Sequence, residues 1–583
     1  MEGNIVKIVK VKIEKFRSIK KAEFEANEIN AIVGENNAGK TTVLRALNAF
    51  FNFEEEKDSF EHRLHQYAPR NNTHIRITFD DIPNQLKQDV FKNKNIIEFI
   101  YDYSKNRRSL RLIERNGKPE SVTSVEQFIT DLEQYIGYVY ISVERTNNEI
   151  SWGNNSVFME LLNKHITVYT QNRDNISSAV RQASKRIHDT ALKKLEKSLN
   201  DLYMQNKDVD FKVDFPPDID YKIFSSSVNL SLQESGIHYG LKEWGSGTKS
   251  LAIIAMQRAN ALLEKKDIIW GIEEPEINLH PQAQKRFIKF LRNNHNEYEK
   301  QTFFTTHSTV LVDELKYNEI LLVRRQKDNT RSFTTCISQV PADFLRQYEM
   351  KEERYYKFFE VRSSEFLFSK YVILCESPTD KLVIEQMIEP KVKDQISDIA
   401  IVTLDGINNI KYPYFLLKKL GIPFSIVVDK DFLFKYKNGE LESSRNNAGL
   451  PQYLADVDVG NPSYGDVLLD IFKSKASLQK LKGDQGYRKL FKNLAPYHIF
   501  SMQYCLEMDL TCTKAVRDIY YSLLSVPNDK KNQKYLLCAN AKAIKRNENI
   551  YEVMNRLSSS GRGYPESFIK IRDALVTEIK RNC

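Results

Sequence analysis

A phosphate-binding loop near the N-terminus limits what this chain can fold into. The loop reads Gly34-Glu-Asn-Asn-Ala-Gly39-Lys40-Thr41 and stands between the apolar run 30–33, a predicted strand, and apolar residues at helical spacing. In this setting the glycines let the backbone approach phosphates, Lys40 contacts the β- and γ-phosphates and Thr41 binds magnesium. The sequence therefore predicts an α/β domain that binds ATP through Gly34, Asn36, Asn37, Gly39, Lys40, Thr41 and Thr42.

A second apolar strand, predicted at 267–272, ends in two carboxylates. Glu273 and Glu274 follow it directly, and the carboxyl end of a buried strand is where magnesium and an attacking water lie in phosphoryl-transfer sites. We predict that Glu274 is the base that polarises this water. Glu273 stands where an aspartate is usual, so we expect it to bind metal weakly or indirectly.

Three further segments follow in the order of an ABC/SMC-type ATPase head, which this region resembles. The loop 244–250 takes the place of the signature loop, 278–281 that of the D-loop, and His307 that of the switch histidine. The resemblance implies that His307 senses the γ-phosphate, and that Ser246 and Gly247 contact nucleotide bound by another subunit. A homodimer or homotetramer assembled through the ATPase domain is therefore expected. Because the signature loop departs from the usual serine-glycine-glycine, we expect slow hydrolysis, with ATP acting more as a gate.

Carboxylates also follow two apolar runs in the second half of the chain. Glu376 ends the run 371–375, and Asp429 and Asp431 follow the run 424–428. The ends of neighbouring parallel strands converge, and magnesium and manganese prefer oxygen ligands, so two ions held there could cleave a phosphodiester. Acidic residues at strand ends also serve as helix caps or turns. Three such elements in order favour a functional site.

The order strand, glutamate, helix, strand and Asp-x-Asp resembles a Toprim domain, with 401–409 matching its middle strand and polar turn. The resemblance implies a two-metal site in which Glu376, Asp429 and Asp431 are catalytic. The implied metal ligands are Glu376, Asp380, Asp429, Asp431 and Glu507, with Thr41 binding the magnesium of ATP. A basic residue that stabilises the phosphate in the transition state is also implied, and its candidates are Lys542, Lys545 and Arg562.

The length of 583 residues predicts several folding units. We expect an ABC-type ATPase domain at 1–345 with a helical dimerisation insert at about 160–210, a linker at 346–370, and a Toprim nuclease domain with a helical C-terminal extension at 371–583. No apolar stretch is long enough to cross a bilayer and no signal peptide is evident, so we expect a cytoplasmic protein without a membrane partner. The six scattered cysteines lack zinc-site spacing.

The net charge of +9 permits binding to a polyanion without proving it. Basic residues gather between Lys473 and Lys492, interleaved with Tyr487 and Phe491. Such a stretch could follow a phosphate backbone while its aromatic rings stack on bases, or it could be a solvated helix face. Both interpretations stay open.

An ABC-type head followed by a Toprim domain, in order from Gly34 to Glu507, resembles the OLD (overcoming lysogenization defect) family of ATPase-nucleases. The resemblance implies nicking or cleavage of DNA with ATP and Mg²⁺ or Mn²⁺ as cofactors, and an antiviral role of the kind found in Gabija, PARIS and retron-associated systems. It also implies a system partner: a helicase, a reverse transcriptase with its nucleic acid, or a small defence protein.

Two other functions are compatible with these motifs. One is a DNA repair or chromosome-maintenance ATPase without nuclease activity, and the other is a nucleotide-sensing scaffold that holds a toxin or effector. The intact Asp429-x-Asp431 pair beside Glu376 favours catalysis over both.

Overall fold

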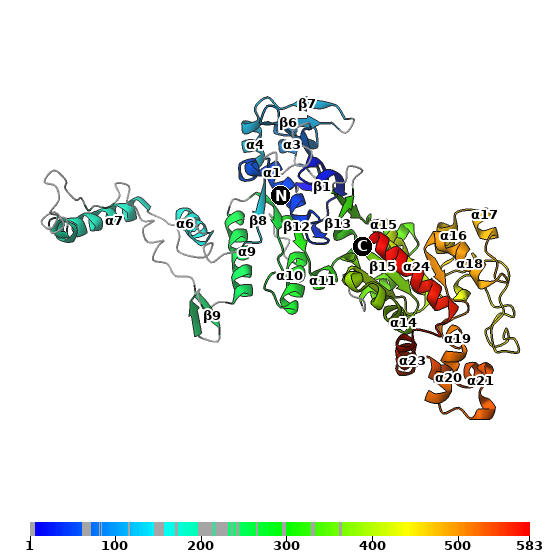
Figure 1. Cartoon of the computed structure of the whole chain (residues 1–583). Helices are drawn as coiled ribbons and strands as arrows, with labels where there is room; N and C mark the ends of the chain where they lie inside the picture. Colours follow the sequence, from blue (N-terminus) through cyan, green and yellow to red (C-terminus); the bar gives the residue numbers. More distant parts are fainter. Residues whose placement is uncertain are drawn as a thin grey trace. The chain divides into compact units, whose positions relative to one another are not determined.

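The computed structural model describes residues 6–583 except 61–70, 81, 83, 115–116, 145–156, 170–172, 196, 198–212, 214, 216–230, 235–236, 241–242, 244, 264–265, 294–298, 328–332 and 361–363. The chain forms two compact units, one of Met1–Ala31 with Gly39–Thr306 and the other of Ile32–Ala38 with His307–Cys583. Figure 1 labels their elements. Both units combine helices with sheets, which confirms the predicted α/β class.

The first unit opens with a six-stranded antiparallel sheet in the order β2-β1-β4-β5-β6-β7. Side chains of β4 alternate between buried and half-buried positions, because one face of the strand lies on the core. The strands are β1 (Lys7–Phe16), β2 (Ile19–Glu25), β4 (Thr73–Asp80), β5 (Ile96–Asp102), β6 (Arg107–Ile113) and β7 (Pro119–Ser121).

The nucleotide-binding motifs lie around a layer of parallel strands. β11 (Asp267–Ile272), the strand predicted at these residues, runs parallel to β8 (Ile136–Ile141) on one side and β12 (Glu299–Thr306) on the other. β3 (Ile29–Val33) is buried throughout, and it begins beside β12 because the backbone N–H of Thr302 donates to the carbonyl of Glu28 over 2.8 Å. The strands that precede the phosphate loop and the Glu273–Glu274 pair thus lie in one layer, on either side of β12.

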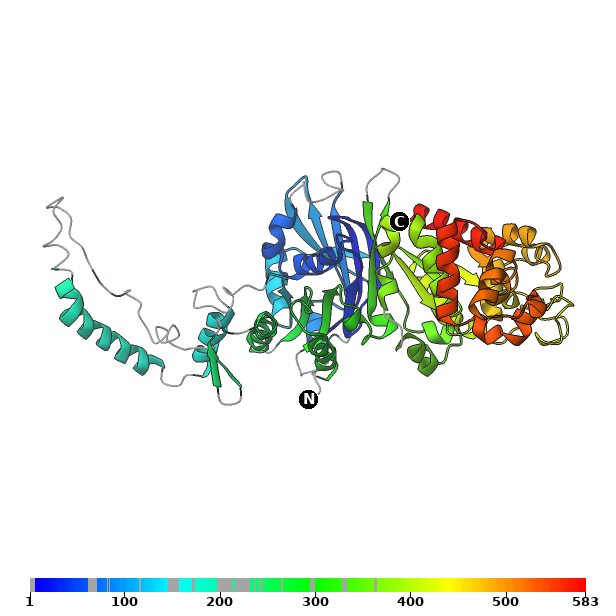
Figure 2. The ribbon, with the colours of Figure 1, turned by 60° about the horizontal axis from the view of Figure 1, so that its bottom comes forward.

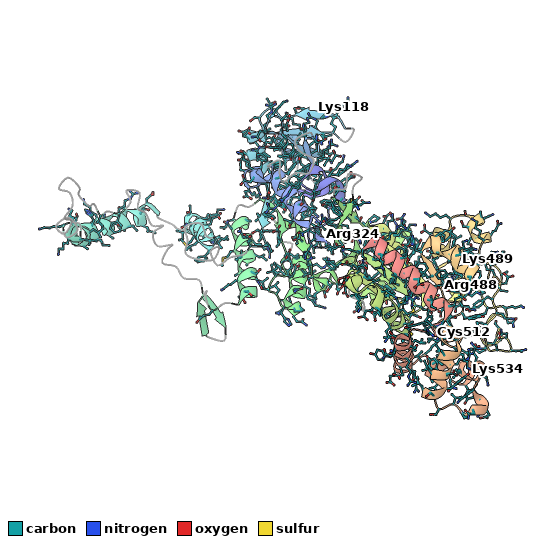
Figure 3. The ribbon with its side chains drawn as sticks, viewed as in Figure 1. Lys118, Arg324, Arg488, Lys489, Cys512 and Lys534 are labelled. Atoms are coloured by element: carbon teal, nitrogen blue, oxygen red, sulfur yellow. The ribbon has the colours of Figure 1, made fainter. Side chains whose placement is uncertain are left out.

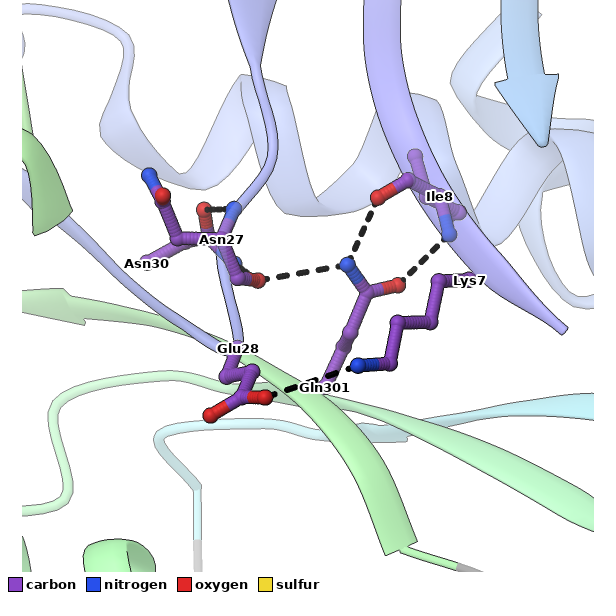
Figure 4. Close-up of polar contacts among 6 residues, drawn as sticks. All are labelled: Lys7, Ile8, Asn27, Glu28, Asn30 and Gln301. Atoms are coloured by element: carbon purple, nitrogen blue, oxygen red, sulfur yellow. Dashed lines mark hydrogen bonds and ion pairs between the residues drawn. The ribbon is translucent and has the colours of Figure 1, made fainter. Parts of the chain in front are cut away.

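A buried glutamine ties β1 to β12, as Figure 4 shows. Gln301 Oε1 accepts a hydrogen bond from Ile8 N over 2.8 Å, and Nε2 donates to Ile8 O over 2.7 Å and to Asn27 O over 3.2 Å. The pairing of β1 with β4 shifts its register between Ile8 and Lys10. The amide satisfies buried backbone groups that a neighbouring strand would otherwise pair.

The predicted insert at about 160–210 is helical where the structure describes it. α6 (Val157–Tyr169) packs on α9 (Ser246–Leu262) through apolar side chains, and α7 (Arg173–Ile187) continues into a π-helical turn, His188–Leu192. The predicted range beyond residue 197 lies outside the described residues. The other elements of this unit are α1 (Lys40–Phe51), α2 (Phe53–Glu56), α3 (Asn84–Asp89), α4 (Val125–Glu133), β9 (Ser231–Glu234), β10 (Ile237–Gly240) and α10 (Pro281–Asn293).

The second unit contains a four-stranded parallel sheet in the order β16-β15-β17-β18. The apolar runs 371–375 and 424–428 coincide with β15 (Tyr371–Cys375) and β17 (Phe424–Val428). β15 is buried at every residue, as expected for a strand covered on both faces. The sheet is completed by β16 (Ile399–Thr403) and β18 (Ile499–Ser501), and the unit also has an antiparallel pair, β13 (Ile320–Lys327) and β14 (Phe333–Gln339).

Helices surround this sheet and fill the C-terminal part, which confirms the predicted helical extension (Figures 1 and 2). Apolar side chains of α14, α20, α23 and α24 form one core with β15. No helix in the described part of the chain is long and apolar enough to span a bilayer. The helices are α11 (Thr309–Val312), α14 (Pro378–Ile388), α15 (Lys411–Leu420), α16 (Gly465–Phe472), α17 (Lys475–Gln479), α18 (Tyr487–Leu494), α19 (Leu506–Leu510), α20 (Lys514–Leu523), α21 (Gln533–Ala539), α22 (Ala541–Ile544), α23 (Asn547–Ser560) and α24 (Glu566–Asn582).

The stretch predicted as a linker at 346–370 has structure of its own. It carries the end of α12 (Phe344–Gln347), α13 (Glu352–Glu360) and the 3₁₀ turn η7 (Ser364–Leu367). Tyr355 and Phe358 of α13 are buried. The domain limits at 345 and 371 therefore stay a proposal.

Candidate functional site

The predicted phosphate loop leads into the N-terminus of α1. Gly39 precedes the helix with φ 104°, and Asn37 has φ 59°, conformations that favour glycine and asparagine. Lys40 is buried to 6% exposure. Helix N-termini with unpaired N–H groups attract phosphate, so the local backbone fits the predicted role.

The first glycine of the loop is fixed by a close backbone approach. At Gly34, which has φ +152°, a Cβ atom would lie 2.0 Å from the carbonyl oxygen of Val323. No side chain fits there without movement of β13. The hydroxyl of Thr335 on β14 also donates to the carbonyl of Ala38 over 2.9 Å, so β13 and β14 support the loop from one side.

The two glutamates after β11 have different surroundings. Glu273 is 5% exposed and its Oε2 accepts a hydrogen bond from Val143 N over 3.0 Å. Glu274 is half-buried and has φ 39°, and its N–H donates to the carbonyl and the hydroxyl of Thr305, each over 3.1 Å. A positive φ in a non-glycine residue is strained and is common at functional sites. This geometry is compatible with Glu274, more than Glu273, as the predicted base.

The predicted signature residues begin α9. Ser246 is its first residue, and a Cβ atom on Gly247 would lie 2.4 Å from the carbonyl oxygen of Asn278. Two segments predicted as signature loop and D-loop are therefore packed together within one subunit. His307 directly follows β12 and is half-buried, and Ser308 caps α11 by accepting from Leu311 N over 3.3 Å.

Three predicted catalytic carboxylates meet at the carboxyl end of the four-stranded sheet. Glu376 directly follows β15, and Asp429 and Asp431 follow β17, its neighbour in the sheet. One oxygen from each of the three lies within 4.8 Å of the others, and all three side chains are half-buried. Among the described residues this is the group whose geometry could hold a metal ion.

Burial and mutual repulsion make these three carboxyl groups weaker acids than usual. Burial, followed by the charges of Asp431 and Asp380, raises the pKa of Glu376 to about 7. Burial and the neighbouring carboxylates also raise the pKa of Asp429 and of Asp431. A divalent cation would remove this repulsion, and hard carboxylate oxygens are the ligands that Mg²⁺ and Mn²⁺ prefer. The residues present therefore fit such an ion.

Two other predicted ligands lie beside the group and not in it. Asp380 is buried, and its Oδ2 accepts from the N–H of Ser377 over 2.9 Å and from the hydroxyl over 2.7 Å, which caps α14. Glu507 is 8% exposed and its Oε1 lies 3.0 Å from Lys545 Nζ. Both carboxylates are close enough to raise the pKa of Asp429. Their role as ligands stays a prediction.

The structure separates the three candidates for the basic residue. All three side chains are exposed, but only Lys545 forms an ion pair with Glu507 among the described residues. The second oxygen of Glu507, Oε2, is buried and has no hydrogen-bond partner among the described residues. Lys545 is the candidate that the fold brings to the carboxylates.

Sequence analysis missed the side chains that support the Asp-x-Asp turn. Tyr436 Oη donates to Asp431 Oδ2 over 2.9 Å, and Lys430 Nζ lies 4.9 Å from the ring centre of Tyr453. The two tyrosine rings pack with centroids 5.3 Å apart. Asp509, next to the predicted ligand Glu507, accepts from Gln503 N over 2.7 Å and Tyr504 N over 2.9 Å. The only signal for Tyr436 was its closeness in sequence to Asp431.

The aromatic residues of the basic stretch are used inside the fold. Tyr487 Oη donates to Ser501 O over 3.2 Å, and the Phe491 ring stacks on Phe500 with centroids 5.8 Å apart. The prediction that these rings stack on bases is therefore not supported. Arg488 pairs with Glu566, and Figure 3 labels Arg488 and Lys489 on α18. The lysines of the stretch remain on the surface.

Two protein families match parts of the chain. The family described as "AAA domain, putative AbiEii toxin, Type IV TA system" matches residues 29–313. The family described as "Overcoming lysogenization defect protein-like, TOPRIM domain" matches residues 367–431. The first match contains the phosphate loop and the second contains Glu376, Asp429 and Asp431, so their order is the one predicted.

Curated relatives align over most of the chain. An OLD nuclease of Thermus scotoductus is 25% identical over 459 residues, which are 72% of this chain and 81% of that protein. Endonuclease GajA of Bacillus cereus (strain VD045) is 22% identical over 87% of this chain and 89% of that protein. The Old nuclease of Escherichia phage P2 is 22% identical over 73% of this chain and 78% of that protein. Among solved structures, an SMC head bound to the C-winged helix domain of ScpA aligns at 14% identity with a TM-score of 0.38, over 58% of this chain and 99% of that chain.

Proposed function

Because this chain belongs to the OLD family of ATPase-nucleases, we propose that it is a divalent-metal-dependent DNA endonuclease whose activity is gated by ATP. Relatives named nuclease and endonuclease align over most of the chain. One of them is encoded by a phage and another is a GajA protein, so we propose a role in conflict between phage and host, with a partner protein of the same system.

The proposal depends most on the three carboxylates that meet at the ends of β15 and β17. Glu376, Asp429 and Asp431 would hold Mg²⁺ or Mn²⁺, with Asp380 and Glu507 at the edge of the site. Such ions activate water and neutralise the leaving oxygen in phosphodiester hydrolysis. Tyr436 keeps Asp431 in place by donating a hydrogen bond. The ammonium of Lys545, 3.0 Å from Glu507, brings a positive charge to the rim, where it can attract a phosphate.

The ATPase part of the proposal depends on the loop before α1. Lys40 and Thr41 would bind the triphosphate and its magnesium, with Glu274 positioning water and His307 sensing the γ-phosphate. Ser246 and Gly247 would close on nucleotide held by a second subunit, which makes a homo-oligomer part of the proposal. The packing of Gly247 on Asn278 would couple those two loops when nucleotide binds.

Cleavage of supercoiled plasmid tests the nuclease. With Mg²⁺ or Mn²⁺ we expect nicked or linear product, and we expect its loss in Glu376→Ala and Asp429→Ala. Asp405→Asn is the matched control, because Asp405 follows β16 at the same edge of the sheet and is not part of the carboxylate group. Unchanged cleavage in the two alanine variants would place the active site elsewhere.

Nucleotide binding is tested separately with Lys40→Ala. Loss of the ammonium contact to the β- and γ-phosphates should abolish ATP binding, measured by fluorescence of a labelled ATP analogue. If the variant binds ATP normally, the loop is not the nucleotide site. Plasmid cleavage by the same variant, with and without ATP, shows whether nucleotide licenses or restrains the nuclease.

A further inference from the structure

The outer strand of the Toprim sheet, β16, has one edge that pairs with no other described strand. Within the described residues, β16 pairs with β15 alone. All of its residues are half-buried, whereas those of β15 are buried. Its sequence, Ile399-Ala-Ile-Val-Thr403, contains neither a charge nor a proline. Proteins normally protect such edges with lysine, proline, a bulge or a covering segment, because the unpaired backbone otherwise recruits another strand.

The backbone of β16 offers hydrogen bonds away from the sheet. Leu404 N donates to Cys375 O of β15 over 2.8 Å, so the N–H of Leu404 faces β15. Successive residues of a strand point their backbone groups to opposite sides. Ala400 and Val402 therefore also face β15, and the N–H and C=O of Ile401 point outward. These are the groups to which an added strand would bind.

A groove runs along this edge. It has a volume of about 550 Å³ and contains all five residues of β16 in its lining. Its other walls come from η7, from the α14 helix and from the turns that follow α14, and include Phe366, Ile396, Glu385 and Glu389. The strand spans roughly 17 Å at the usual rise per residue, a length that fits an extended segment of about five residues.

The rim of the groove carries a negative charge. Its lining contains the glutamates Glu365, Glu385 and Glu389 and one lysine, Lys381, which pairs with Glu385 over 3.7 Å. Glu385 and Glu389 are four residues apart and so lie on one face at the end of α14. A second copy of this edge would bring the same carboxylates opposite one another, which is unfavourable. A basic segment would instead neutralise them.

We propose that β16 is a docking edge for an extended, lysine- or arginine-bearing segment of a partner protein, which adds to the Toprim sheet as a fifth strand. The outward backbone groups at Ile401 supply the hydrogen bonds. The apolar lining takes alternate side chains, and the glutamates of the rim select basic residues at the positions between them. This surface is built from different residues than the nuclease site, so the two proposals can fail independently.

The test uses the full-length protein and a heptapeptide that alternates lysine and valine, with a glutamate–valine heptapeptide for comparison. We expect the basic peptide to bind more tightly by fluorescence anisotropy and to slow hydrogen exchange within Ile399–Thr403. N-methylation of alternate peptide residues, which removes N–H donors from one edge, should abolish binding. Equal affinity for both peptides, or protection outside β16, would overturn the proposal.

Two sets of variants separate charge from strand pairing. Glu385→Lys with Glu389→Lys should weaken binding of the basic peptide about tenfold and strengthen binding of the acidic one. Glu440→Lys with Glu442→Lys is the control, because it makes the same charge change at exposed residues elsewhere in this unit. Ile401→Pro removes an N–H that faces away from β15, so the sheet keeps its pairing and peptide affinity falls about fivefold. An unchanged affinity in both sets refutes the docking edge. Self-association of the wild type that Ile401→Pro disrupts would identify a second copy as the occupant and overturn the basic partner.

Discussion

Two glutamates are held in opposite ways in the two halves of this molecule. Glu98, in the antiparallel sheet of the first unit, is 2% exposed and lies 2.7 Å from Arg76 Nε and 2.9 Å from His74 Nδ1. Burial alone would raise its pKa, but these two hydrogen bonds outweigh burial and lower it. Glu376 has no such partner among its main neighbours, which are mostly other carboxylates, and its pKa rises to about 7.

The difference separates a carboxylate whose charge is compensated by side chains of the protein from a group of carboxylates that needs a bound cation. A buried charge stabilises a protein only if a partner compensates for its desolvation. The fold supplies that partner at Glu98. At the ends of β15 and β17 it gathers like charges instead, so stability is lower than it would be with neutral residues, as is common at catalytic sites. The following predictions test this contrast.

The largest effect is expected for Asp429→Asn. Loss of one of the three carboxylates should lower plasmid cleavage by about 10³-fold, because the ions that neutralise developing charge would bind poorly. Without metal, the same change removes repulsion, so the free energy of unfolding should stay the same or rise. Urea unfolding in the presence of a chelator measures this, and a clear loss of stability would contradict the view that the group is strained.

Gly34→Ala should reduce ATP affinity by roughly 10–100-fold, since the new methyl group would overlap the carbonyl of Val323 and displace the loop. Gly486→Ala is the matched control, because a Cβ atom there meets nothing within 4 Å and its φ is -58°. Isothermal titration with ATP measures the effect. Normal affinity in Gly34→Ala would mean that the loop can adjust, and that its backbone is less rigidly set than the structure indicates.

Tyr436→Phe should weaken metal binding about tenfold, because residues that orient a ligand typically have effects of this size. The variant loses only the hydrogen bond to Asp431. We expect more Mn²⁺ to be needed for half-maximal cleavage, with nearly normal cleavage once Mn²⁺ saturates. Tyr453→Phe, which keeps its ring beneath Lys430, should need no additional metal. If both variants behave alike, the effect is one of packing.

The sequence predicted the backbone of the phosphate loop and the position of the carboxylate group for different reasons. The strand, loop and helix around Gly34–Thr41 were predictable because their requirements are local: apolar runs and glycines at fixed spacing determine this backbone. The strands β15 and β17 were predictable from uninterrupted apolar runs, and their ends placed Glu376, Asp429 and Asp431 at one edge.

What could not be predicted depends on long-range packing. The ion pair between Lys545 and Glu507 follows from how the helices near the C-terminus fold back on Glu507. Local sequence does not show this, because Lys545, Lys542 and Arg562 lie in similar polar surroundings. Tyr487 and Phe491 show the same limit, because their sequence context left base stacking and a solvated helix face equally open. The fold uses them for packing against β18.

The smallest effect is expected for a substitution of Glu98, and it concerns the free energy of unfolding. Glu98→Gln keeps the shape and removes the charge that Arg76 and His74 face, so we expect unfolding at pH 7 to cost about 1–2 kcal/mol less, with no change in plasmid cleavage. The pKa of Glu98 is lowered in the folded protein from an ordinary value of 4.5. Its stabilisation is therefore present above pH 4.5 and is lost as the pH falls through the folded pKa.

The difference in stability between wild type and Glu98→Gln should accordingly shrink once the pH falls below 4.5 and Glu98 becomes protonated. Urea unfolding above and below this pH measures it. A difference that does not shrink below pH 4.5 would show that Glu98 is not stabilised by its charge, and would remove the contrast with Glu376. A shrinking difference would mean that the fold compensates the charge of Glu98, in contrast to Glu376, whose charge is left for a cation.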